Sequence, residues 1–394
     1  MKKLSLAVCL ASATFGVAQE PPREWTDPAT HHRIIRLSDE PGSASLYFHQ
    51  NAYTAKGDLM VFTTRNGISV IDLHTRKIRP LVEGRVSDVV VGRRTRQVFY
   101  FKGDAVCQTS LDSGETRVIV TKPELRSGSG LAVNADETLL GGSFLEGPTP
   151  QASPPSTATL QPHGDNYPGK GEMMERRLAA RLPMALYTIS IKTGEVKTFN
   201  HSTDWLNHVQ FSPTDPNLIL FCHEGPWHKV DRIWTIHTDG TGLRKIHTRT
   251  MDMEIAGHEF FGADGKTVWY DLQTPKGKEF WLAGVVLATG EPIRHRVERS
   301  EWSVHYNVSP DDKLFAGDGG GPNSVAAPGN GQWIYLFTPV NGALKAEKLV
   351  DLAKHDYRLE PNVTFTPDGK WIVFRSNMFG PTHVFEVEVE AEKP

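Results

Sequence analysis

The sequence has few cysteines, no strong excess of one charge and little helical periodicity. Of its three cysteines, Cys9 lies in the first residues, which leaves Cys107 and Cys222. One disulfide between them is allowed but not required, because the apolar core of a chain of 394 residues is large enough to stabilise the fold without it. The net charge is −3, and without a basic excess we expect no nucleic-acid partner.

Long apolar runs are also scarce. Beyond the first residues, no segment has the roughly 20 apolar positions that a membrane-spanning helix needs. Residues 1–18 have the layout of a secretory signal, with two lysines, the apolar stretch Leu4–Phe15 and the small residues Gly16-Val-Ala18. We therefore expect cleavage near Gln19 and a periplasmic or secreted protein.

What the sequence does contain is a repeated phrase. In five places a polar residue stands five positions before an Ala or Pro, and a β-rich run usually follows an Asp-Gly-Lys-like turn. The pairs are Gln50 and Ala55, His208 and Pro213, His258 and Ala263, His305 and Pro310, and Asn362 and Pro367. Two weaker copies of the turn begin at Arg93 and Ala135. Repetition at a fixed period of roughly 40 to 50 residues indicates a repeat architecture.

Each repeat contains about four short strands, which is typical of an all-β fold, the β-propeller. Counting repeats predicts seven blades in a single domain over residues 19–394. A long loop and a short helix, Glu172–Arg181, form an expected insertion in blade 3 at about residues 144–182. A β-sandwich array or an α/β fold is the alternative. We also expect a strand within His32–Leu37 to complete the last blade, since this closure removes an exposed sheet edge.

The polar residue of each repeat should lie at the start of the innermost strand, on one ring around the central channel. The predicted ring is Gln50, Asp88, Gly130, His208, His258, His305 and Asn362. A lone His in such a place is more often a satisfied polar group that closes the blades. Three in the same position suggest a base or a metal ligand.

Glu360 precedes Asn362 by two residues and so faces the same side of its strand. Together with His305, these residues offer nitrogen and oxygen donors that suit Mn²⁺ or Ca²⁺ better than Zn²⁺. We expect a divalent metal at His305, Glu360 and Asn362. In the alternative, Glu360 pairs with Arg358 and no metal binds.

A second cluster of ionisable residues surrounds the turn Gly225-Pro226. It includes His223, Glu224 and Arg232, and either contributes to a binding site or forms a salt-bridged loop. We expect substrate contacts from His223 and Glu224, and from His208 and Gln50 on the ring.

Several phrases resemble those of the oligogalacturonate lyases, in the same order, from about residue 30 to the C-terminus. They are Phe221-Cys-His-Glu-Gly-Pro226, Arg232-Ile-Trp234, Gly257-His-Glu-Phe260, Phe315-Ala-Gly-Asp-Gly319 and Phe365-Thr-Pro-Asp368. The family consists of seven-bladed propellers that cleave short pectin oligomers by β-elimination. The resemblance implies a uronate-containing oligosaccharide as substrate.

The resemblance also implies roles for single residues. His258 matches the family's catalytic base, Arg232 an arginine at the uronate, and His305 a metal-ligating histidine. The family's Gln-x-x-His-x-His is replaced here by Tyr357, Glu360 and Asn362. Two other functions stay open: a propeller that only binds a ligand or protein, and a glycan hydrolase that uses Glu224, Glu259 or Glu360 as paired carboxylates.

Overall fold

A computed structural model describes residues 21–128, 130–147, 170–324 and 327–391. Within these ranges strands dominate, and the helices are α1 (Lys170–Ala180) and the short 3-10 helices η1 (Pro123–Ser127) and η2 (Arg299–Glu301). The all-β prediction and the helix expected over Glu172–Arg181 are confirmed. The predicted signal at residues 1–18 lies outside the described residues. None of the described helices has the length and apolarity required to cross a bilayer.

Strands that follow each other in the chain pair antiparallel and form separate sheets. The first contains β3 (Leu59–Thr64), β4 (Gly67–Asp72) and β5 (Ile78–Glu83). The second contains β6 (Ser87–Val91), β7 (Gln97–Lys102), β8 (Ala105–Ser110) and β9 (Thr116–Thr121). The third contains β10 (Ala132–Val133), β11 (Leu139–Leu145), β12 (Met184–Ser190) and β13 (Val196–Ser202), with α1 between β11 and β12 in the chain.

The next sheets follow the same pattern. One contains β14 (Trp205–Phe211), β15 (Leu218–Glu224), β16 (Ile233–His237) and β17 (Arg244–Lys245). Another has eight strands: β18 (Ile255–Phe261), β19 (Thr267–Gln273), β20 (Phe280–Val286), β21 (Pro292–Val297), β22 (Tyr306–Val308), β23 (Phe315–Gly317), β24 (Trp333–Val340) and β25 (Ala343–Asp351). Its two halves are four-stranded meanders, joined where β21 and β25 pair in parallel at Arg296 and Ala343.

The last sheet joins the two ends of the described chain. Its strands are β26 (Thr364–Phe365), β27 (Trp371–Ser376), β28 (His383–Glu388), β2 (Arg33–Arg36) and β1 (Glu24–Thr26). β2 pairs with β28, with Ile34 opposite Val387. The prediction that a strand within His32–Leu37 completes the C-terminal sheet is therefore confirmed.

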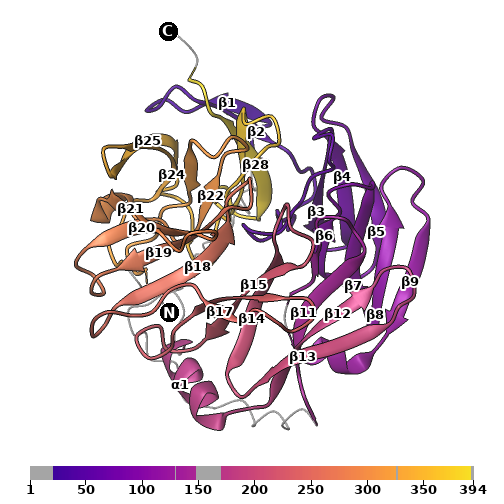
Figure 1. Cartoon of the computed structure of the whole chain (residues 1–394). Helices are drawn as coiled ribbons and strands as arrows, with labels where there is room; N and C mark the ends of the chain where they lie inside the picture. The colour runs from indigo at the N-terminus through magenta and orange to yellow at the C-terminus, as the bar shows by residue number, and fades with distance from the viewer. Residues whose placement is uncertain (1–20, 129, 148–169, 325–326, 392–394) are drawn as a thin grey trace, which may run out of the picture.

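The sheets are arranged around a common centre (Figure 1). Side chains from neighbouring sheets share the apolar clusters, as Leu186 of β12 and Phe221 of β15 do. Because each sheet packs on both faces, many strands read as continuous apolar runs. In β7, four consecutive residues, Val98 to Phe101, are buried. Cys107 and Cys222 are buried and free, so no disulfide joins them.

Candidate active site

A bend in the backbone recurs at five of the seven predicted ring residues. The pairing register shifts in β6 between Ser87 and Val90, in β14 between Asn207 and Gln210, and in β18 between Gly257 and Phe260. The φ angle is 52° at Asp88, 78° at Gly130, 50° at His208, 45° at His258 and 55° at Asn362. A bulge of this kind redirects a side chain out of the regular alternation. The shared backbone shape supports the sequence alignment of these five positions, including its loosest members.

Each of the three ring histidines lies next to a carboxylate from the second strand of its own meander. His258 Nδ1 is 2.8 Å from Asp271 Oδ1, and His305 Nδ1 is 2.8 Å from Asp318 Oδ2. His208 Nε2 is 3.8 Å from Glu224 Oε2. Asp271 and Asp318 were not predicted. Both follow their histidine by 13 positions, from 258 to 271 and from 305 to 318, and this spacing was the signal available in the sequence.

Arg232 is the centre of a buried ionic cluster. Its Nε donates to Glu259 Oε2 and its Nη1 donates to Glu224 Oε1, both at 2.8 Å, while Nη2 lies 3.2 Å from His208 Nδ1. The Arg232 side chain is 3% exposed. Burial alone would raise the pKa of Glu259, but Arg232 and His208 outweigh it and hold that pKa below its ordinary value. Glu259 is thus a permanent carboxylate, and a new partner of Arg232 would have to displace an existing one.

His258 keeps limited access to solvent, with 16% of its side chain exposed, whereas Asp271 is buried at 2%. Burial raises the pKa of Asp271 to about 7. The pair therefore changes its protonation near neutral pH. When Asp271 is ionised, it accepts a hydrogen bond from the Nδ1–H of His258, and the Nε2 lone pair is then available as a base.

His305 and Asn362 are fully buried around Asp318. Asp318 accepts hydrogen bonds from the backbone N–H groups of both residues, at 2.8 Å and 3.2 Å. The His305 Nε2 atom lies 3.6 Å from Glu360 Oε2 and 3.2 Å from the Tyr47 hydroxyl. Burial lowers the pKa of His305, but the carboxylates of Asp318 and Glu360 outweigh it, and the net shift is upward.

The segment Tyr47–Gln50 lies among the ring histidines, and sequence reasoning missed its first three residues. The ring centroids of Tyr47 and His305 are 5.2 Å apart, those of Phe48 and His258 6.3 Å, and those of His49 and His208 5.6 Å. Residues of this segment line a cavity of about 250 Å³ that also reaches Asp88, Gly130 and His208. Tyr47, Phe48 and His49 precede the first copy of the repeat, which begins at Gln50, so no repeat motif pointed to them.

Of the other residues predicted to contact substrate, two lie at this centre and one points away from it. Glu224 belongs to the Arg232 cluster and Gln50 lines the cavity beside His208. His223 instead points away: its Nδ1 is 3.2 Å from Asp204 Oδ2 and its ring stacks on Trp234 at 4.9 Å. Because Glu224 and His223 are adjacent in β15, they face opposite sides of the strand.

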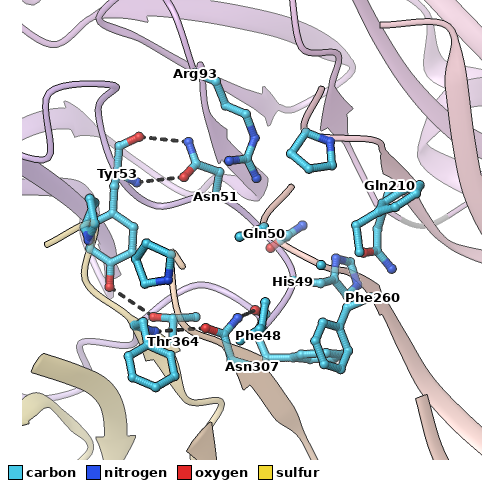
Figure 2. A pocket seen from close by; sticks show the side chains of 18 of the residues that line it. Phe48, His49, Gln50, Asn51, Tyr53, Arg93, Gln210, Phe260, Asn307 and Thr364 are labelled. Carbon is cyan, nitrogen blue, oxygen red and sulfur yellow. Dashed lines mark hydrogen bonds between the residues drawn. The ribbon is translucent and has the colours of Figure 1, made fainter. Parts of the chain in front are cut away.

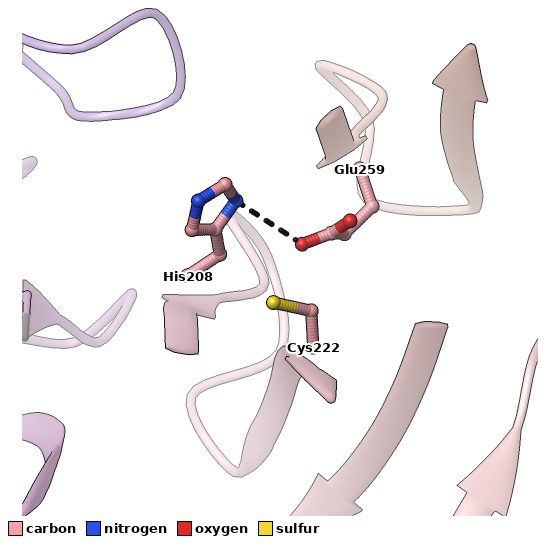
Figure 3. A group of neighbouring side chains, drawn as sticks. All are labelled: His208, Cys222 and Glu259. Atoms are coloured by element: carbon pink, nitrogen blue, oxygen red, sulfur yellow. Dashed lines mark ion pairs between the residues drawn. The ribbon is translucent and has the colours of Figure 1, made fainter. Parts of the chain in front are cut away.

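Two groups of side chains are candidates for a metal. The first is His208, Cys222 and Glu259, whose potential ligand atoms all lie within 4.8 Å of one another (Figure 3). Arg232 already supplies positive charge there, and burial raises the pKa of the Cys222 thiol well above its ordinary value. A thiol that stays protonated is a poor ligand.

The second group is His305 with Glu360, which fits a divalent ion better. Asp318 behind the imidazole directs Nε2 towards Glu360, as carboxylates behind metal-bound histidines commonly do. Asn362 Oδ1 accepts from the Phe48 N–H at 3.2 Å, so its amide oxygen already serves the Tyr47–Gln50 segment.

The fold and the centre together define an all-β, propeller-like protein with a buried group of histidines, carboxylates and an arginine. A family model described as oligogalacturonate lyase matches residues 177–392, more than half of the chain. The chain belongs to the oligogalacturonate lyase family, and the resemblance inferred from the sequence is confirmed.

Known relatives agree with this assignment. The chain is 30% identical over 221 residues to the oligogalacturonide lyase of Pectobacterium atrosepticum, a match covering 52% of this chain and 55% of that protein. The chain thus spans about half the length of this curated relative.

Solved structures show the fold over almost the whole chain. One is an oligogalacturonate lyase in complex with manganese, with a TM-score of 0.77 and 23% identity over 93% of this chain and 96% of the other. An oligogalacturonate lyase from Vibrio parahaemolyticus gives a TM-score of 0.79 at 23% identity, with the same coverage of 93% and 96%.

Proposed function

We propose that this protein is a lyase that cleaves uronate-containing oligosaccharides, such as oligogalacturonates, by β-elimination. The observation that carries the proposal is the pair of His258 and Asp271, in contact at 2.8 Å and on a ring position that keeps some solvent access. Family membership supplies the substrate class.

In the proposed reaction, His258 Nε2 takes the proton at C5 of the uronate. The electrons of that C–H bond form the C4–C5 double bond, the C4–O bond breaks, and the departing oxygen takes a proton from water, while His258 later returns its proton to solvent. Ionised Asp271 holds the Nδ1 proton and so keeps Nε2 free. A positioned base of this kind contributes about 10² to 10⁴-fold.

Arg232 enters the proposal as a fixed positive charge near the uronate. Its contacts with Glu224 and Glu259 keep it in place, and its contact with His208 orients that ring towards the cavity. Direct contact between Arg232 and the uronate would replace one of these partners. His208, Gln50, Glu224 and His223 remain proposed substrate contacts, with the first two best supported because they line the cavity.

For the metal, we propose one divalent ion, Mn²⁺ or Ca²⁺, held by His305 and Glu360, with Asn362 as a further ligand. When bound, such an ion neutralises charge at the uronate carboxylate and so favours the carbanion-like state. The Glu360 and Asn362 oxygens suit both ions, the His305 nitrogen favours Mn²⁺ over Ca²⁺, and the manganese complex of a structural neighbour is consistent with Mn²⁺.

We also propose the finer architecture and location. The sheets would be seven blades if the eight-stranded sheet counts as two, and residues of about 144–182, which contain α1, would be an insertion in the third. The secretory signal at residues 1–18 would direct the protein to the periplasm or outside the cell.

The hydrolase alternative, with Glu224, Glu259 or Glu360, has less support. Glu224 and Glu259 both bind Arg232 and Glu259 stays ionised, while Glu360 lies 3.6 Å from His305. A hydrolase needs one carboxyl group that keeps its proton. The deciding experiment is incubation with oligogalacturonates while following ultraviolet absorbance of the unsaturated product, with His258→Ala as control. Reducing ends that appear without this absorbance would indicate a hydrolase, and binding without any cleavage would indicate a ligand-binding propeller.

A further inference from the structure

A second cavity lies at the other end of the innermost strands. It has a volume of about 350 Å³ and is lined by Gln50 and by residues that follow the ring positions, such as Gln210 and Asn307. The Ala and Pro residues five positions after the ring also line it, namely Pro213, Ala263, Pro310 and Pro367. The lining starts two positions after the ring residues and reaches five positions after them, so this cavity runs along the innermost strands away from the histidine centre. Phe48 lines this cavity, and His49 and Gln50 line both it and the cavity beside His208.

Arg93 breaks the repeat at this second cavity. It occupies the position five residues after Asp88, where the other copies have Ala or Pro. A turn that accepts Ala or Pro elsewhere does not need an arginine. Arg93 lines the cavity and its side chain extends inwards, towards the side where Gln50 lies (Figure 2).

The Arg93 guanidinium has no hydrogen bond or ion pair within the described part of the chain. The protein around Arg93 keeps water away from the guanidinium and so lowers its pKa, and no carboxylate offsets this effect. The residues that line the cavity include no Asp or Glu. His49 adds no charge, because burial and the neighbouring His208 hold its pKa well below the ordinary value.

The side-chain amides around the cavity differ in whether the protein already uses their N–H groups in hydrogen bonds. Asn51 donates to the carbonyls of Tyr53 and Val91, both at 2.8 Å, and Asn307 donates to the Phe48 carbonyl at 3.1 Å. These two amides are used to hold the backbone. The Gln50 side chain has no hydrogen-bond partner among the described residues, so it can donate to a ligand beside Arg93.

We propose that this cavity is a second binding site, for a small organic carboxylate. Arg93 would bind the carboxylate with two parallel N–H groups, and Gln50 would donate a further hydrogen bond. The fork of an arginine matches a carboxylate in this way. A single arginine suits one negative charge, and the rings of Phe48, Phe260 and Phe365 offer an apolar wall to the rest of the ligand. The volume suits a ligand of about one sugar ring.

The test is calorimetric titration with galacturonate as the probe and galactose as its neutral counterpart. Arg93→Gln should weaken galacturonate binding about 10-fold or more, and Arg94→Gln, a change at the adjacent arginine that does not line the cavity, should leave it within about 2-fold. Galactose should bind the wild type at least 10-fold more weakly than galacturonate.

Three results would overturn the proposal. They are equal binding of galacturonate by wild type and Arg93→Gln, equal binding of galactose and galacturonate, and loss of binding in His258→Ala with retention in Arg93→Gln. The last result would place the ligand at the histidine centre. Because binding is measured without turnover, absence of lyase activity would not affect the outcome.

Discussion

Replacing Asp271 by Asn tests the proposed base directly. In the wild type, ionised Asp271 accepts the Nδ1–H of His258 and leaves Nε2 unprotonated. The amide of Asn can instead donate to Nδ1, which moves the ring proton to Nε2 and blocks proton abstraction. The shape of the site changes little, since Asp and Asn are nearly isosteric.

The expected size of the effect follows from the contribution of a positioned base, about 10² to 10⁴-fold. We expect kcat to fall at least 10²-fold in Asp271→Asn. Because burial raises the pKa of Asp271 to about 7, the wild-type rate should rise as pH increases through that value. The difference between the two proteins should therefore be largest above pH 7.

Whereas the rate should rise with pH, the contribution of Asp271 to the stability of the wild type should fall with pH. Since the pKa of Asp271 is higher in the folded protein than its ordinary value of 3.8, the folded state favours the protonated form. This contribution is complete below pH 3.8 and is lost as pH rises through about 7. Asn cannot ionise, so the variant should gain stability relative to wild type over that range, as measured by the free energy of unfolding.

Initial rates on oligogalacturonates, followed by ultraviolet absorbance between pH 5 and 9, provide the assay. A matched control is Glu254→Gln, because Glu254 and His247 form a similar pair, 2.6 Å apart, away from the ring. The control should lower thermal stability without altering the pH profile of the rate. If Asp271→Asn keeps a rate within a few-fold of wild type at pH 8, the tautomer argument is wrong.

Three further changes test the rest of the centre. His258→Ala should lower turnover about 10²-fold or more and leave the melting temperature nearly unchanged, because it removes a base rather than packing; a fall in stability with activity retained would contradict this. Arg232→Lys should lose one of the contacts to Glu224 and Glu259, and we expect a loss of about 1–3 kcal/mol in the free energy of unfolding together with reduced activity. Glu360→Ala should lower the metal content found by elemental analysis, and full activity in metal-free wild type would refute the metal proposal.

The sequence was most informative where the repeat dictates backbone shape. The aligned residues His208, His258 and Asn362 share left-handed φ angles, and a register shift recurs around His208 and His258. Asp88 and Gly130, the two loosest members of the ring, share this conformation. A repeated local conformation leaves a sequence pattern even when the residue type varies.

What the sequence did not predict depends on contacts between different strands. Asp271 and Asp318 reach their histidines only because the second strand pairs in a particular register, with Gly257 opposite Asp271 in one case. Arg232 was predicted from resemblance to contact the uronate, but its partners Glu224 and Glu259 come from two different sheets. Pairing of this kind is a property of the folded ring, and single-strand patterns do not contain it.

The balance of charge at the histidine centre explains why a bound cation would be useful there. The carboxylates that contact the ring residues are Glu224, Glu259, Asp318 and Glu360, and Asp271 joins them above pH 7. Arg232 and Arg375 supply less positive charge than these groups supply negative. A uronate would enter a region that already repels it, and at low effective dielectric constant such repulsion is costly. The raised pKa of His305 shows the same field acting on a proton, because Asp318 and Glu360 outweigh the effect of burial. A divalent ion between His305 and Glu360 would reverse the sign of the charge at the place where the substrate's carboxylate must come close, and Glu360 strengthens the attraction for that ion.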